Sequence, residues 1–186
     1  MTMSFDISST LIILATAFNG IMAGASLDQS IKQLPSRHKI GPKAFSAYSQ
    51  AADLGNGIIW YATIGIGSAS LTIAAAIIIL FQEIGYSYYA IAIYVAAVLS
   101  VAHSAATSKA AQTNFSQRKA YDDEQALILV FGHFERLHLV RAVLQVGTFG
   151  AMLVGLYIGS DHIDSLNLSQ SYYFIENFIT VTLNVC

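Results

Sequence analysis

Cysteine and charge are what this sequence has least of. Its one cysteine, Cys186, stands at the C-terminal end, which excludes an intrachain disulfide and a cysteine-based zinc site. Charged residues make up 11% of the 186 residues, less than half of the roughly 25% typical of a soluble domain. Hydrophobic residues make up 55%. We therefore expect lipid, rather than water, to surround most of the chain.

Two further absences narrow the possible functions. Residues 1–9 contain no basic residue, so a cleavable signal peptide is not expected. The net charge of −2 is close to neutral and gives no indication of a nucleic-acid partner.

Long apolar runs are plentiful, and four of them can cross a membrane. The predicted spans cover about residues 7–27, 54–81, 88–107 and 139–158, and a spanning helix needs about 20 residues. The sequence thus predicts an all-α membrane protein, with a four-transmembrane-helix bundle in residues 1–159. Residues 160–186 are expected to form a C-terminal, non-cytoplasmic tail packed at the membrane interface, because Glu176 interrupts the apolar run there.

Proline is rare, and both prolines, Pro35 and Pro42, fall in the polar connection of residues 28–53. Because proline disrupts a helix interior, a long straight helix is not expected there. The acidic residues 122–124 are expected to begin the helix that leads into the fourth span, since carboxylates are favourable at a helix N-terminus.

Basic residues are confined to one side of the predicted bundle. All of them lie in the connections after the first and third spans or at the start of the fourth: Lys32, Arg37, Lys39, Lys43, Lys109, Arg118, Lys119, Arg136 and Arg141. The positive-inside rule places such loops in the cytoplasm. We therefore expect both termini on the non-cytoplasmic side of a bacterial-type cytoplasmic membrane.

Polar residues gather at the cytoplasmic ends of the predicted spans. Asp28, Asp53, Asn56, His103 and the stretch 133–141 all lie there. Ionisable groups inside a membrane span are costly and by default indicate function. Within and just after the stretch 133–141, four polar residues recur every three or four positions, so on a helix they share one face: Glu135, His138, Arg141 and Gln145.

These groups predict a pocket inside the membrane. Asn19 lies about 13 Å deeper than Asp28 at about 1.5 Å per residue, and we expect it to form the pocket floor. Apolar walls with a few polar groups suit a flat, hydrophobic small molecule. Asn56, Trp60, Asn114 and Glu135 are further candidates for binding it.

Each candidate also has a purely structural interpretation. His138 and Arg141 can extend to lipid headgroups, and His103 can bond a neighbouring helix. Asn19 and Asn56 can form interhelical hydrogen bonds. Trp60 can belong to the aromatic belt at the membrane interface.

The stretch Phe134-Glu135-Arg136-Leu137-His138-Leu139-Val140-Arg141, followed by a glycine-dotted span, resembles the DUF1772 family of anthrone oxygenase-like membrane proteins. Residues 24–28, the Thr113-Asn114 pair and residues 48–56 fit the same family. The resemblance covers roughly residues 17–156. It implies a small four-span protein, and fungal members of the family oxidise anthrones to anthraquinones with O2.

The leading hypothesis is therefore a cofactor-independent oxygenase acting on a lipophilic phenolic or anthrone-type substrate. His138 or His103 would act as the base. Arg141 would stabilise the oxyanion that develops, and Asn56 or Asn114 would orient it. No cofactor is required in this reading.

Two alternatives stay open. His103 and His138 are on different helices at similar depth and can be axial haem ligands or part of a metal site. The third hypothesis is a non-catalytic accessory subunit that packs in a larger membrane complex or homo-oligomer, or binds a lipid or quinone.

Overall fold

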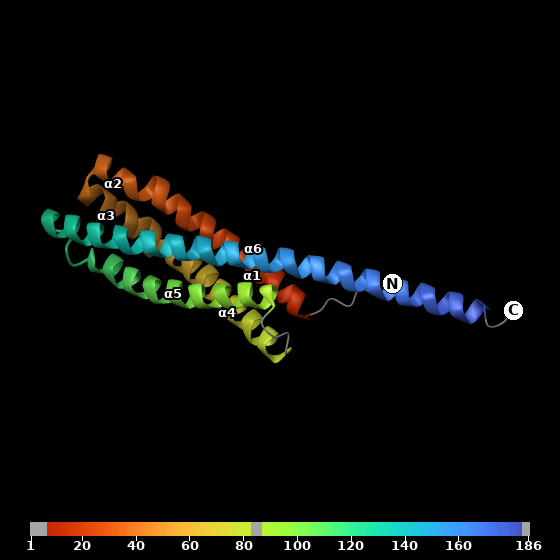
Figure 1. Ribbon diagram of the computed structural model, residues 1–186. Helices are drawn as coiled ribbons and strands as arrows, with labels where there is room; N and C mark the ends of the chain where they lie inside the picture. Colours follow the sequence, from red (N-terminus) through yellow and green to blue (C-terminus); the bar gives the residue numbers. More distant parts are fainter. Residues whose placement is uncertain (1–6, 83–86, 184–186) are drawn as a thin grey trace.

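The computed structural model describes the backbone of residues 7–82 and 87–183, and the side chains within these ranges as far as Gly159. The described chain is helical throughout and forms a bundle (Figure 1). Four of its helical segments are long and apolar enough to cross a membrane: Ile7–Ile40, Pro42–Phe81, Tyr88–Ser116 and Glu124–Gly159. The predicted four-span helical bundle is therefore confirmed, and the protein is an integral membrane protein.

A helical hairpin joins the first two spans. α1 (Ile7–Asp28) continues through the π-helical turn η1 (Gln29–Gln33) into α2 (Leu34–Ile40). Gly41, at φ 83°, turns the chain into α3 (Pro42–Ala51). A second π-helical turn, η2 (Ala52–Asn56), leads into α4 (Gly57–Phe81).

The connection of residues 28–53 is thus more helical than the sequence predicts. Pro42 occupies the first turn of α3, where a missing N–H breaks no helical bond, and Pro35 lies just after the π-helical turn η1. The expectation that no single straight helix spans this region holds, because the chain reverses at Gly41.

The helices that contain the last two spans extend beyond the predicted spans. α5 (Tyr88–Ser116) begins at Ser87, whose hydroxyl accepts a hydrogen bond from the Ala90 N–H at 3.2 Å. α6 (Glu124–Leu183) begins beside Asp123, whose carboxylate accepts from the N–H groups of Gln125 and Ala126. The acidic residues 122–124 do therefore mark the start of this helix.

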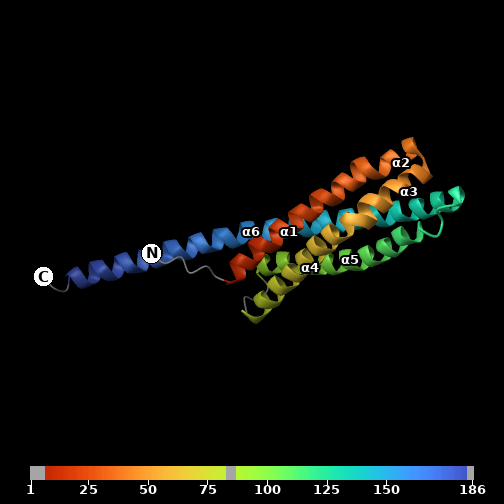
Figure 2. The same ribbon diagram turned by 180° about the vertical axis from the view of Figure 1, so that it is seen from behind.

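The predicted end of the fourth span near residue 158 is not a helix end. The backbone of α6 stays helical to Leu183 and projects beyond the other helices (Figures 1 and 2). Residues 160–183 contain neither glycine nor proline, so nothing local interrupts the helix. Whether this tail packs at the membrane interface stays a prediction, because its side chains lie outside the described residues.

Two apolar clusters hold the bundle together at different heights. One joins α1, α4, α5 and α6 near the end of the bundle that contains Gln82, and includes Ile12, Ile79 and Ile93. The other joins α2, α3, α5 and α6 near Gly41 and includes Phe45 and Phe131, whose rings meet edge to face at 5.0 Å. We call this second end the basic end, since the described lysines and arginines gather toward it. Polar side chains occupy the interior between the clusters.

Candidate functional site

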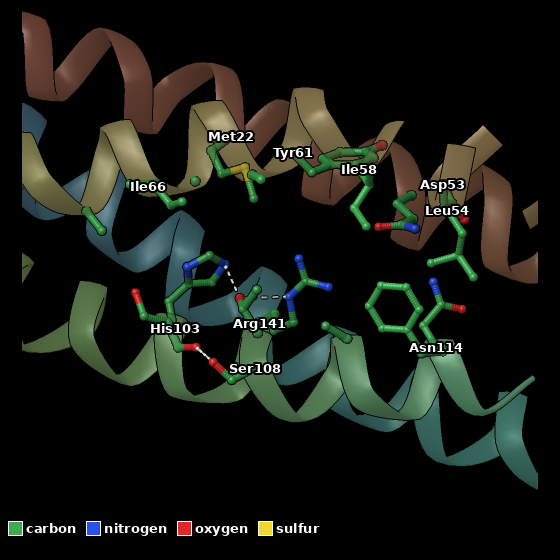
Figure 3. A pocket seen from close by; sticks show the side chains of 18 of the residues that line it. Met22, Asp53, Leu54, Ile58, Tyr61, Ile66, His103, Ser108, Asn114 and Arg141 are labelled. Carbon is green, nitrogen blue, oxygen red and sulfur yellow. Dashed lines mark hydrogen bonds between the residues drawn. The ribbon is translucent and has the colours of Figure 1, made fainter. Parts of the chain in front are cut away.

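A cavity of about 490 Å³ lies between the two apolar clusters. Its walls come from α4 and α5, and α1 and α6 close its inner side (Figure 3). Most of the wall is apolar, including Ile58, Ile66 and Phe115. The polar groups in its lining are Gln29, Asp53, Tyr61, Ser70, His103, Ser104, Thr107, Ser108, Asn114 and Arg141. The arrangement fits a lipophilic small molecule with a polar group.

Arg141, Thr107 and His103 form a connected group in this lining. The Arg141 Nε donates to the Thr107 hydroxyl oxygen at 3.1 Å. That hydroxyl lies 3.4 Å from the Nε2 of His103. In Figure 3, dashed lines connect His103 and Arg141 to the oxygen between them. The threonine therefore links the one guanidinium and the one imidazole that line the cavity.

Arg141 is buried and is attracted by the Asp53 carboxylate without a direct contact. Its residue is 9% exposed, and it forms no ion pair within residues 7–82 and 87–159. Asp53 lines the same cavity but accepts a hydrogen bond from the Ser49 hydroxyl at 3.0 Å. A guanidinium has five N–H donors, so Arg141 keeps donors available for an oxygen of a bound molecule.

The two π-helical turns bring polar groups into the cavity. Gln29 opens η1, and Asp53 and Leu54 belong to η2. Gly55 departs from helical backbone angles at φ −95° and ψ −119°. Single π-helical turns within α-helices occur frequently at functional sites, and here two of them flank one cavity.

His138 lies behind the cavity and does not line it. The residue is fully buried, and its Nε2 is 3.2 Å from the carbonyl oxygen of Ser26. A carbonyl only accepts, so Nε2 carries the hydrogen and Nδ1 is free to accept. The Arg141 guanidinium lies 3.5 Å from that Nδ1. His138, predicted as a candidate base, thus contacts Arg141 from behind the cavity.

Glu135 faces a second cavity, of about 480 Å³, near the basic end. Its carboxylate pairs with Arg37 of α2, and His138 also borders this space. Of the predicted stripe on α6, Glu135 and His138 thus border the second cavity, Arg141 lines the first, and Gln145 lines neither.

Asn19 belongs to a polar network at the centre of the bundle. Its Nδ2 donates to the Thr72 hydroxyl at 2.8 Å, and its Oδ1 accepts from Gln145 at 2.9 Å. It is fully buried and is not part of the cavity lining. The predicted floor residue thus connects three helices instead, and Met22 of α1 lines the cavity in its place.

Two other predicted binding residues lie outside the cavity, and one lies inside it. Asn56 is exposed and Trp60 is 55% exposed, both away from the lining. The kink at Gly55 separates them from Asp53, with which a regular helix would align them. Asn114 does line the cavity and accepts a hydrogen bond from Gln117 at 2.7 Å.

Thr107 and Tyr61 also line the cavity, although the sequence did not predict them as site residues. Thr107 follows His103 by four residues, a spacing that places both on one helix face, so a signal was present. Tyr61 carries no such signal, because an interfacial tyrosine is common in membrane helices.

Whether the protein binds a metal ion or haem stays a prediction. The described residues contain no group of three or more His, Cys, Asp or Glu side chains arranged to hold a metal ion. His138 has both ring nitrogens engaged, so pairing it with His103 as a second axial ligand would require breaking those contacts.

Comparisons with protein-family models, curated proteins and solved structures find no match to this chain.

Proposed function

We propose that this protein is an anthrone oxygenase-like membrane enzyme that uses O2 to oxidise a lipophilic phenolic or anthrone-type substrate inside the bundle. The observation that carries this proposal is that His103 and Arg141 line the same largely apolar cavity. A base and an anion-stabilising group in a dry pocket are what such a reaction requires.

The chemistry divides between these two residues. His103 removes a proton from an acidic C–H or O–H of the substrate, and Arg141 stabilises the resulting oxyanion. The electron-rich anion then transfers electrons to O2 and forms a carbon–oxygen bond. For an anthrone, the hydroperoxide loses water to leave a ketone, so CH2 and O2 become C=O and H2O. Asn114 is placed to orient the anionic oxygen.

The orientation follows from the distribution of charge. The lysines and arginines of the described chain lie toward the end of the bundle that contains Gly41 and the turn between α5 and α6 (Figure 1). The positive-inside rule assigns this end to the cytoplasm. The cavity then opens in the cytoplasmic half of a bacterial-type cytoplasmic membrane, with both termini on the opposite side.

The test is O2 consumption by the purified protein in detergent with anthrone as substrate, corrected for spontaneous oxidation. We expect His103→Gln to lower the rate by about 10²-fold or more, the usual contribution of a general base. His133→Gln is the matched control, since His133 is exposed and outside both cavities. A full rate in His103→Gln would contradict the proposal.

A further inference from the structure

The cavity opens sideways, between α4 and α5. Several residues that line it are also exposed on the surface of these helices: Ile58 at 40%, Ile66 at 68% and Ile73 at 37%. Ser104 and Ser108 on α5 are likewise both lining and exposed. The mouth is therefore at the side of the bundle, within two of the membrane-spanning segments.

Packing at one end explains why the mouth exists. The apolar cluster near Gln82 joins α4 and α5 through small side chains, among them Ala75, Ala76 and Ala96. At the opposite end, η2 changes the course of the chain just before α4 begins. The two helices are thus held together at one end, and the cavity lies between them farther along.

The mouth and the inner side of the cavity differ in chemistry. Arg141 and His103 are buried on the inner side, at 9% and 4% exposure. The α4 side of the mouth carries branched aliphatic side chains, which match the hydrocarbon of a bilayer, and the α5 side carries Ser104 and Ser108. A molecule that fills both regions has a polar head directed inward and an apolar part directed toward the lipid.

We propose that the ligand is a phenol carrying a long alkyl or prenyl tail, which enters from the bilayer between α4 and α5. Its hydroxyl group lies against Arg141, the buried cation that makes no direct ion pair within the described residues, and its tail leaves between Ile66 and Ser104. The phenolic head rests on the proposed function, whereas the sideways route and the tail rest on the geometry of the mouth.

Photo-labelling tests this directly. The probe is 3-pentadecylphenol with a diazirine in its tail, added to the full-length protein in phosphatidylcholine nanodiscs, and labelled residues are mapped by mass spectrometry. We expect labelling to concentrate on α4 and α5 at residues 66–73 and 100–108. Excess unlabelled 3-pentadecylphenol should reduce that labelling at least about tenfold. Pentadecylbenzene, which lacks the hydroxyl, should not.

Two variants separate a blocked mouth from a damaged fold. Ala69→Phe places a ring at a residue that lines the cavity and should reduce the competable labelling at least about fivefold. Ala105→Phe makes the same change at an exposed residue outside the lining and should leave it unchanged. Equal effects of the two variants would overturn the proposal.

Other outcomes also decide the matter. Equal competition by pentadecylbenzene would mean that the tail samples only surrounding lipid. Loss of labelling when phosphatidylglycerol replaces phosphatidylcholine would mean that an anionic lipid occupies the site. Either result overturns the proposal.

The same preparations distinguish this proposal from the enzymatic one. Hydroxyl-dependent labelling of the mouth without O2 consumption would retain the ligand site and remove the oxygenase function. Oxidation of anthrone without labelling of the mouth would retain the oxygenase function and remove the proposed ligand and its sideways route.

Discussion

Arg141 is the residue on which the candidate site depends. Removing a cation from water costs several kcal/mol, roughly, even in real proteins. Arg141 recovers part of this through the Thr107 hydroxyl, the contact with His138 and the attraction of the Asp53 carboxylate, with which it makes no direct ion pair. An anionic oxygen in the cavity would complete its interactions, which makes Arg141 the natural anchor for a ligand.

At this scale, Thr107 is expected to control the alignment of base and cation. Thr107→Val keeps the shape but removes the hydroxyl between Arg141 and His103. We expect kcat for anthrone oxidation to fall about fivefold, because loss of one such hydrogen bond is worth roughly 1 kcal/mol and about 1.4 kcal/mol corresponds to tenfold in rate. Thr107→Ser, which retains the hydroxyl, should keep kcat within about twofold. Equal losses in both variants would assign Thr107 a packing role only.

At the scale of elements, the π-helical turn η2 determines which residues of the second span reach the cavity. The N–H of Gly57 donates to the carbonyl oxygen of Ala52, five residues earlier. The extra residue in this turn rotates the following helix relative to a regular one. Asp53 consequently lines the cavity, while Asn56 and Trp60 do not.

Gly57 is expected to be required for that turn. A Cβ atom there would clash with the backbone oxygen of Ala52, and backbone cannot give way as a flexible side chain can. We predict that Gly57→Ala lowers the free energy of unfolding by about 1–3 kcal/mol, typical of overpacking. Thermal unfolding in detergent, followed by circular dichroism, measures this change.

Gly24→Ala is the control, because a Cβ at Gly24 meets nothing within 4 Å. That change should be neutral or stabilise the protein by up to about 1 kcal/mol, since alanine favours a helix over glycine. If Gly57→Ala unfolds at the same temperature as Gly24→Ala, the turn tolerates a side chain and this account of η2 is incorrect.

At the scale of the whole molecule, the bundle places a polar layer between two apolar clusters and collects the basic residues beyond one of them. The network of Asn19, Thr72 and Gln145 joins three helices within that layer. The Arg37–Glu135 pair then connects α2 to α6 nearer the basic end. Apolar packing at both ends and polar contacts between them keep the cavity at a defined depth.

The orientation of the molecule can be tested by single cysteines on a Cys186→Ser background. Lys39→Cys and Gln82→Cys place thiols at exposed positions toward opposite ends of the bundle. We expect a membrane-impermeant maleimide to label position 82 in intact cells and position 39 only after permeabilisation, because basic loops remain in the cytoplasm. The reverse pattern would invert the proposed orientation.

The four spans, and the end of the bundle toward which polar groups gather, could be predicted from the sequence alone. The low proportion of charged residues and the long apolar runs indicate a membrane protein. Such runs form helices in lipid, because a helix satisfies all of its backbone hydrogen bonds internally. The sequence also identified Arg141, His103 and Asn114, since polar side chains within apolar spans are conspicuous.

Which of these groups share a cavity could not be predicted from the sequence, because it depends on how the helices pack. The π-helical turn at η2 moved Asn56 and Trp60 away from it, a local change that a regular helical repeat does not predict. Packing of α1 against α6 engaged His138 with Ser26 and Asn19 with Gln145. These contacts join residues more than 100 positions apart, so periodicity within one helix contains no information about them.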